Sequence, residues 1–194
     1  MGIHWVTYFQ ALQMSSVAIG MLSLFTYPVI TAVLEPILLK TRFQPVHILL
    51  SLLTLLGLYM LLPDFDLGNQ QVLAVGFGLF SAIAYAFRNV LMKPMVTRYA
   101  SSHIMTYQML ITGLLLFPYL LWQGFGSIET EWPSILFLAL ITTVVGHTLF
   151  LYSFRNFSVT TASIFSGLQP IYGIVLAAIF LQEYPDWNIY LGGG

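Results

Sequence analysis

Six long apolar runs dominate this sequence and restrict the chain to a membrane fold. A helix needs roughly 20 apolar residues to cross a hydrocarbon core about 30 Å thick, and each run is close to that length. None carries a charge near its centre, and turn-forming residues separate them, as in 63–69 and 124–127. The runs cover residues 17–39, 46–62, 71–92, 104–122, 133–153 and 159–181. We therefore predict an all-α, polytopic membrane helix bundle.

The charge content excludes several other classes of protein. Only 7% of the residues are charged, whereas soluble domains carry about 25%. The net charge of −1 provides no basic patch for nucleic acid. The chain has no cysteine, so disulfides, thiolate zinc sites and cysteine nucleophiles are excluded. No cofactor and no metal site are predicted.

The charged residues between the runs alternate in sign and predict an orientation. Lys and Arg mark the cytoplasmic side of membrane proteins. Basic loops at 40–45, 93–103 and 154–158 are therefore predicted to face the cytoplasm, and the acidic loop at 63–70 the outside. We expect a multi-pass protein of the cytoplasmic, or inner, membrane.

Two shorter apolar segments lie at the ends of the sequence. Residues 2–14 are few for a span, and 187–194 stop after about two turns. A backbone that ended there would leave helix carbonyls unpaired at membrane depth. We therefore expect the chain to be a fragment that lacks helices at both ends.

An internal repeat appears when the chain is shifted by 142 residues. The run 17–39 then falls on 159–181, and Pro28 falls on Pro170. The shift spans an odd number of predicted helices, so the two copies would cross the membrane in opposite directions. Such inverted repeats are typical of secondary transporters, in which two similar halves move about a site at their interface.

The motifs around these prolines resemble the EamA-like members of the drug/metabolite transporter superfamily. The resemblance rests on residues 4–18 leading into Tyr27-Pro28, and on residues 160–163 leading through Gln169-Pro170 to 181–183. It implies ten helices in two inverted repeats of five. Residues 1–62 would be the last three helices of the first repeat, the first of them partial. A loop at 63–70 would follow, and residues 71–194 would be the second repeat, with its last helix cut short. The chain would then run from the end of the third helix to the start of the tenth.

The family pattern places a Glu thirteen residues after the mid-helix proline. Glu183 fits this pattern after Pro170, but position 41 is Thr, and Glu35-Pro36 lies earlier instead. The helix of the first repeat therefore lacks the Glu that the family pattern places at its end.

A polar stripe predicts which face of the helix at 17–39 turns inward. Ser23, Tyr27, Thr31 and Glu35 recur at helical spacing. Polar groups in membrane helices face the bundle or a wet cavity. Glu35 is the candidate for a proton-coupling carboxylate, with an interaction at the headgroups as the alternative.

The remaining candidates come from equivalent positions and from other inward stripes. Tyr27 and Gln169 each precede a proline, where a helix kink at Pro28 or Pro170 would free a backbone carbonyl. Interhelical hydrogen bonding is the alternative role for all of them. The substrate-cavity candidates are Tyr27, Gln169, His147, Tyr85, Tyr8 and Ser166.

Together these features predict a transporter of small organic metabolites that works by alternating access. The expected partners are a small-molecule substrate and the lipid bilayer, with no nucleic acid, and a homodimer is left open. An inactive fragment or membrane scaffold is one alternative. The other is an intramembrane enzyme, because Ser166-Gly167 is similar to part of a serine-protease motif, although Ile164 replaces its first glycine.

Overall fold

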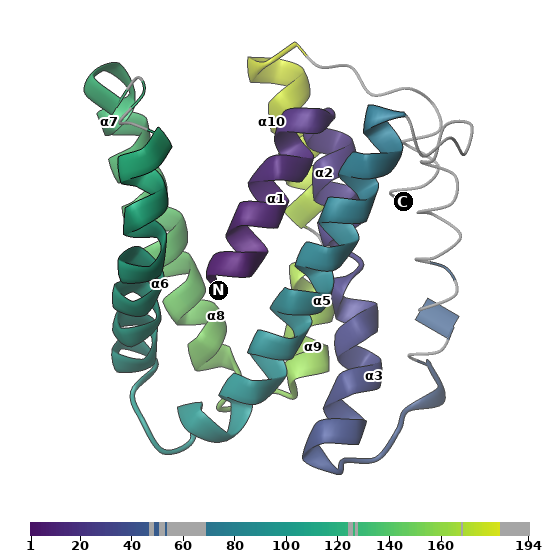
Figure 1. Ribbon diagram of the computed structural model, residues 1–194. Helices are drawn as coiled ribbons and strands as arrows, with labels where there is room; N and C mark the ends of the chain where they lie inside the picture. Colours follow the sequence, from purple (N-terminus) through teal and green to yellow (C-terminus); the bar gives the residue numbers. More distant parts are fainter. Residues whose placement is uncertain are drawn as a thin grey trace. The chain divides into compact units, whose positions relative to one another are not determined.

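The computed structural model describes residues 1–46, 49–50, 53, 69–123, 126, 128–167 and 169–182. Within these ranges the chain forms helices and turns and no strand, which confirms the predicted all-α fold. The α-helices, labelled in Figure 1, are α1 (Gly2–Met14), α2 (Val17–Leu24), α3 (Tyr27–Leu39), α5 (Gln70–Val96), α6 (Ser101–Gln123), α7 (Ile128–Phe137), α8 (Thr148–Ser153), α9 (Val159–Ser166) and α10 (Gln169–Phe180). The π-helix η1 (Leu138–His147), which has no label in the figure, joins α7 to α8.

Four stretches of the described residues are long and apolar enough to cross a membrane. They are Ile19–Leu39, Gln70–Val96, Ser101–Trp122 and Thr130–Ser153. The predicted helix at 46–62 lies almost wholly outside the described residues, as do most of the loop at 63–70 and all of 187–194.

The predicted continuous helix at 17–39 is wrong in one respect, because two helices occupy it. The Ser16 side chain accepts a hydrogen bond from the backbone N–H of Ile19 and begins α2. The helix then breaks at Phe25 and Thr26. Pro28 sits at the second position of α3 and has no N–H to donate to the preceding turn, which favours a break at this point.

The predicted helix at 159–181 is broken in the same way. Here α9 ends at Ser166 and α10 begins at Gln169, with Pro170 at its second position. A shift of 142 residues therefore superimposes the bounds of α2 on those of α9 and the start of α3 on that of α10.

The other predicted helices need smaller corrections. The structure extends α5 beyond the predicted 71–92 and α6 beyond 104–122 at both ends. The predicted helix at 133–153 begins earlier, at Ile128, and its centre is the π-helix η1. The hydrophobic pattern identifies a membrane-spanning helix, but it does not distinguish an α-helix from a π-helix.

By its contacts the chain divides into two compact units. One comprises Met1–Gly2 with Leu91–Ser158, and the other Ile3–Val90 with Val159–Gly194. We call them the α6–α8 unit and the α1–α10 unit.

In the α1–α10 unit, the two broken helices form two pairs, α2 with α3 and α9 with α10, and these pairs pack on each other. α3 packs against α9, and α10 packs against α2. Since the second half of each pair meets the first half of the other, the two pairs run antiparallel, as Figure 1 shows.

A close contact between α2 and α5 also shapes this unit. Gly78 on α5 lies directly against Ser23, such that a Cβ atom on Gly78 would stand 2.4 Å from the Ser23 Cβ. Small residues of this kind let membrane helices approach each other.

In the α6–α8 unit, two basic side chains join the ends of neighbouring helices. Lys93 near the end of α5 donates to the carbonyls of Phe154 and Phe157, the second at 2.7 Å. In return, Arg155 after α8 donates from Nε to the carbonyl of Val96 at 2.9 Å. Carbonyls at helix C-termini lack partners within the helix, and cations are favoured there. The residues that predict a cytoplasmic position for these loops therefore also cap the helices.

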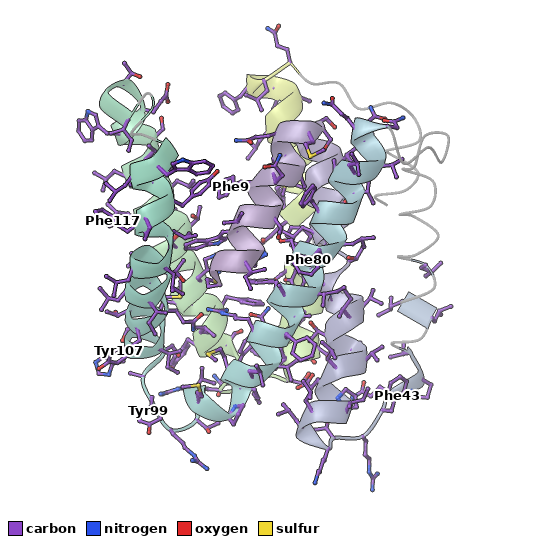
Figure 2. All side chains as sticks on the ribbon, in the orientation of Figure 1. Phe9, Phe43, Phe80, Tyr99, Tyr107 and Phe117 are labelled. Carbon is purple, nitrogen blue, oxygen red and sulfur yellow. The ribbon has the colours of Figure 1, made fainter. Side chains whose placement is uncertain are left out.

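Apolar side chains cover the outer faces of the long helices. Tyr107 and Phe117 project from α6, and Phe80 projects from α5 (Figure 2). Such an apolar surface is compatible with contact to the hydrocarbon tails of lipids.

Candidate functional site

Stacked aromatic rings lie at the centre of the α1–α10 unit. The His4 ring stacks on Tyr85 with centroids 4.4 Å apart, and Tyr85 meets the edge of Tyr27 at 4.9 Å. Tyr8, one turn after His4 on α1, lies 6.2 Å from the same imidazole. All but the half-buried Tyr8 are buried. Two predicted candidates, Tyr8 and Tyr85, thus lie beside the His4 ring, and a third, Tyr27, contacts Tyr85.

Polar groups hold this histidine in place. The Ser81 hydroxyl donates to the His4 carbonyl at 2.8 Å, and His4 Nδ1 lies 2.7 Å from the same hydroxyl oxygen. Because a hydroxyl has one hydrogen to donate, Nδ1 is the donor in the second bond. The α1 backbone and the imidazole are therefore both fixed against α5.

A buried arginine extends the group along α5. The Arg88 guanidinium lies 5.9 Å from the centroid of the Tyr85 ring, within the range of a cation–π contact. Its Nη1 donates to Asn89 Oδ1 at 2.9 Å. Arg88 is 7% exposed and Asn89 is fully buried.

Helix α9 completes the group through Ser166. The Tyr27 hydroxyl lies near the Ser166 side chain, and the Ser166 hydroxyl donates to the Ala162 carbonyl at 3.1 Å. We call the set His4, Tyr8, Tyr27, Ser81, Tyr85, Arg88, Asn89 and Ser166 the central cluster.

Two other cavity candidates lie apart from these contacts. Gln169 begins α10 and its side chain is exposed. His147 ends η1 in the α6–α8 unit and is half-buried. π-helical turns occur often at functional sites, so His147 stays a prediction, as does Gln169.

Glu35 caps a helix of the opposite pair. Its Oε1 accepts from the backbone N–H of Val159 at 2.9 Å, and its Oε2 accepts from the N–H and the hydroxyl of Thr160 at 2.8 and 2.6 Å. These groups are all buried. Backbone N–H groups at a helix N-terminus have no partner within the helix, and the helix dipole favours a negative charge there. Glu35 therefore joins α3 to the start of α9.

The polar stripe at 17–39 is buried throughout. Ser23 and Thr31 are fully buried, and each hydroxyl donates to a carbonyl one turn earlier on its own helix. Tyr27 and Glu35 instead reach other helices, as described above. The stripe therefore faces the interior, and its two larger members connect α3 to α5 and α9.

Sequence reasoning missed Arg88 and His4 as members of the site. In the sequence, Arg88 lies near the end of its apolar run, a position that is also compatible with a headgroup contact, and His4 is close to the start of the sequence. A signal was present for both. Arg88 shares the helical face of Ser81 and Tyr85, and His4 lies one turn from Tyr8.

Comparison with known proteins identifies the family. The profile of the EamA-like transporter family matches residues 1–62 and 72–194. The chain belongs to this family. The match confirms the resemblance inferred from the motifs around Pro28 and Pro170.

Two curated relatives have been assigned transported solutes. An S-adenosylmethionine uptake transporter of Rickettsia conorii is 25% identical over 131 residues, which are 66% of this chain and 45% of the relative. A pseudopaline exporter of Pseudomonas aeruginosa is 23% identical over 193 residues, 98% of this chain and 67% of the relative. The chain thus spans less than half the length of the first.

A solved crystal structure shares the fold of this EamA-like chain. It superimposes with a TM-score of 0.72 at 16% sequence identity, and the match covers 97% of this chain and 67% of that one.

Proposed function

We propose that this protein carries small organic metabolites across the cytoplasmic membrane by alternating access of two inverted repeats. The observation that carries the proposal is the central cluster itself. Ionisable and aromatic side chains from α1, α3 and α5 meet, with Ser166 of α9 beside them, inside helices that are apolar outside. Polar groups are expensive at membrane depth, and there they mark the paths of solutes.

The antiparallel broken helices support the alternating-access part of the proposal. Each half of one pair packs on the opposite half of the other, α3 on α9 and α10 on α2. Movement of one pair would therefore change both of these contacts. Half-helices and breaks near the membrane centre are typical of transporters of this kind. The central cluster adjoins the break before Tyr27, where substrate would be held.

Membership of the EamA-like family supports the solute class. The two relatives described above take their substrates in opposite directions, one by uptake and one by export. We therefore propose transport of small metabolites without assigning a direction.

The Tyr27 hydroxyl tests the position of this site. A thermal-shift screen of metabolites on the purified protein would first identify a ligand. Tyr27→Phe then removes only the Tyr27 hydroxyl, which lies near Ser166. We expect the dissociation constant of that ligand to rise about tenfold, the effect of roughly 1.4 kcal/mol.

Tyr107→Phe is the matched control, because Tyr107 is exposed on α6. It should leave the affinity unchanged. Equal affinities for wild type and a well-folded Tyr27→Phe protein would place the substrate elsewhere, with His147 and Gln169 the next positions to test.

A further inference from the structure

Two lines of polar side chains lead from the central cluster toward one end of the α1–α10 unit. Residues three or four positions apart share one face of a helix, so each line follows one helix face. The lines consist of Tyr27, Thr31 and Glu35 on α3, and of Ser166, Ser163 and Thr160 on α9. We call them the polar lines.

The polar lines meet at both of their ends. In the central cluster, the Tyr27 hydroxyl lies near the Ser166 side chain. At the far end, the Glu35 carboxylate accepts from the N–H and the hydroxyl of Thr160. Since α3 packs against α9, the remaining members, Thr31 and Ser163, occupy the turn between these two contacts.

The middle and far end of the polar lines are closed to solvent. Thr31 and Ser163 are fully buried, and so are the groups that join Glu35 to Thr160. The Thr31 hydroxyl donates to the Tyr27 carbonyl, whereas the Ser163 hydroxyl has no partner at hydrogen-bonding distance in the described part of the chain. A buried hydroxyl without a partner costs free energy, which contact with water would recover. The lines therefore suit a wet path that is closed in this state.

The carboxylate distinguishes this end of the unit from the other. The shift of 142 residues that aligns the two broken helices places Glu35 on Ala177 and Thr160 on Ala18. Alanine has no acceptor, so the corresponding position on α10 carries no carboxylate for the start of α2. That start is capped locally instead, by the side chain of Ser16. The repeat is thus fastened asymmetrically.

Basic residues adjoin the fastened end in the sequence. Lys40 directly follows α3, and Arg155 lies four residues before α9. Lys and Arg mark the cytoplasmic side of membrane proteins. The contact between Glu35 and the start of α9 therefore lies at the end that is predicted to face the cytoplasm.

We propose that the Glu35 carboxylate is the latch of a cytoplasmic gate, which closes a solute path between the polar lines. The path would run from the central cluster to the cytoplasmic end and would open when α3 releases the start of α9. This inference rests on the proposed transport function and adds that the described state is closed at this end. Alternating access requires such a contact to form and break, because only one end of the site is open at a time.

Single cysteines test the path, because the chain has no native cysteine. Thr31→Cys and Ser163→Cys each place a thiol on one polar line. Ala74→Cys supplies the reference thiol: Ala74 is fully buried next to Val75, which packs on Ile19 near the start of α2. Each protein is purified, placed in lipid nanodiscs that leave both faces accessible, and treated with a water-soluble maleimide. The measurement is the rate of labelling, which reports how often the thiol meets water and requires no substrate.

Removal of the latch should open the path selectively. Glu35→Ala should raise the labelling rate of both thiols on the polar lines about tenfold, the effect of roughly 1.4 kcal/mol on opening, and that of the reference thiol less than about twofold. Thr160→Val removes one of the three hydrogen bonds to the carboxylate and should give a smaller increase. Glu131→Ala, which removes an exposed carboxylate on α7, is the control and should change none of the rates.

Three patterns of labelling would contradict the latch. Rates that Glu35→Ala leaves unchanged would show that the carboxylate does not hold this end closed. An equal rise at all three thiols would indicate general unfolding, and a rise at Ser163→Cys without Thr31→Cys would indicate fraying of α9 rather than a path. If the protein catalyses solute counterflow while its labelling ignores Glu35, this inference alone fails and the proposed function stands.

Discussion

Glu35→Ala is expected to lower the free energy of unfolding by about 3 kcal/mol. The substitution deprives two backbone N–H groups and one hydroxyl of their acceptor at the buried start of α9. Hydrogen bonds to charged groups contribute about 1.5–3 kcal/mol each, and buried donors without partners cost about 1–3 kcal/mol. The individual terms do not add fully, because α9 can shift and water can enter. Unfolding in mixed detergent micelles, followed by circular dichroism, would measure the loss.

Two further variants separate the cap from a general effect of charge. Glu35→Gln keeps one oxygen that can accept from α9 and should cost about half as much. Glu131→Ala removes an exposed carboxylate on α7 and should change stability by about 0.5 kcal/mol or less. If Glu35→Ala were no more harmful than Glu131→Ala, the contact between α3 and α9 would not depend on the carboxylate.

Gly78→Ala should destabilise the protein by about 2 kcal/mol, although alanine is the better helix former. The added Cβ would stand 2.4 Å from the Cβ of Ser23 and 3.5 Å from its carbonyl carbon. A flexible side chain could move aside, but a Cβ and a backbone atom can move only if α2 and α5 separate. The same unfolding measurement applies.

Gly76, half a turn earlier on α5, provides the opposite expectation. A Cβ there meets nothing within 4 Å, so Gly76→Ala should be neutral or stabilise by up to about 1 kcal/mol through helix propensity. Adding Ser23→Gly to Gly78→Ala should restore part of the lost stability. Equal effects of the two alanine substitutions would mean that α2 and α5 are not packed as described.

The spans and their inner faces could be predicted because they follow from local patterns. Apolar length predicts a crossing, and the spacing of Ser23, Tyr27, Thr31 and Glu35 predicts the buried face of their helix. The structure buries all four. The 142-residue correspondence also has a local signal, because Pro28 and Pro170 lie at the same distance from the starts of α2 and α9.

The helix breaks and the identity of the partners could not be predicted in this way. A proline inside an apolar run is compatible with a kink or a break, and tertiary packing decides between them. The bonds from Glu35 to the start of α9 join residues that are 124 and 125 positions apart in the sequence. No local pattern encodes such a long-range contact. Arg88 was missed for a related reason, because a position near a span end suits both a headgroup contact and burial beside Tyr85.

Solute counterflow in proteoliposomes tests the central claim most directly. Vesicles that contain the protein are loaded with an excess of the unlabelled ligand found in the screen and diluted into a trace of the same labelled compound. We predict transient accumulation of label above the level in protein-free vesicles, with a reduced initial rate for Tyr27→Phe and a normal rate for Tyr107→Phe. A ligand that binds to the central cluster, but whose label enters no faster than in protein-free vesicles, would contradict the claim that this site serves transport.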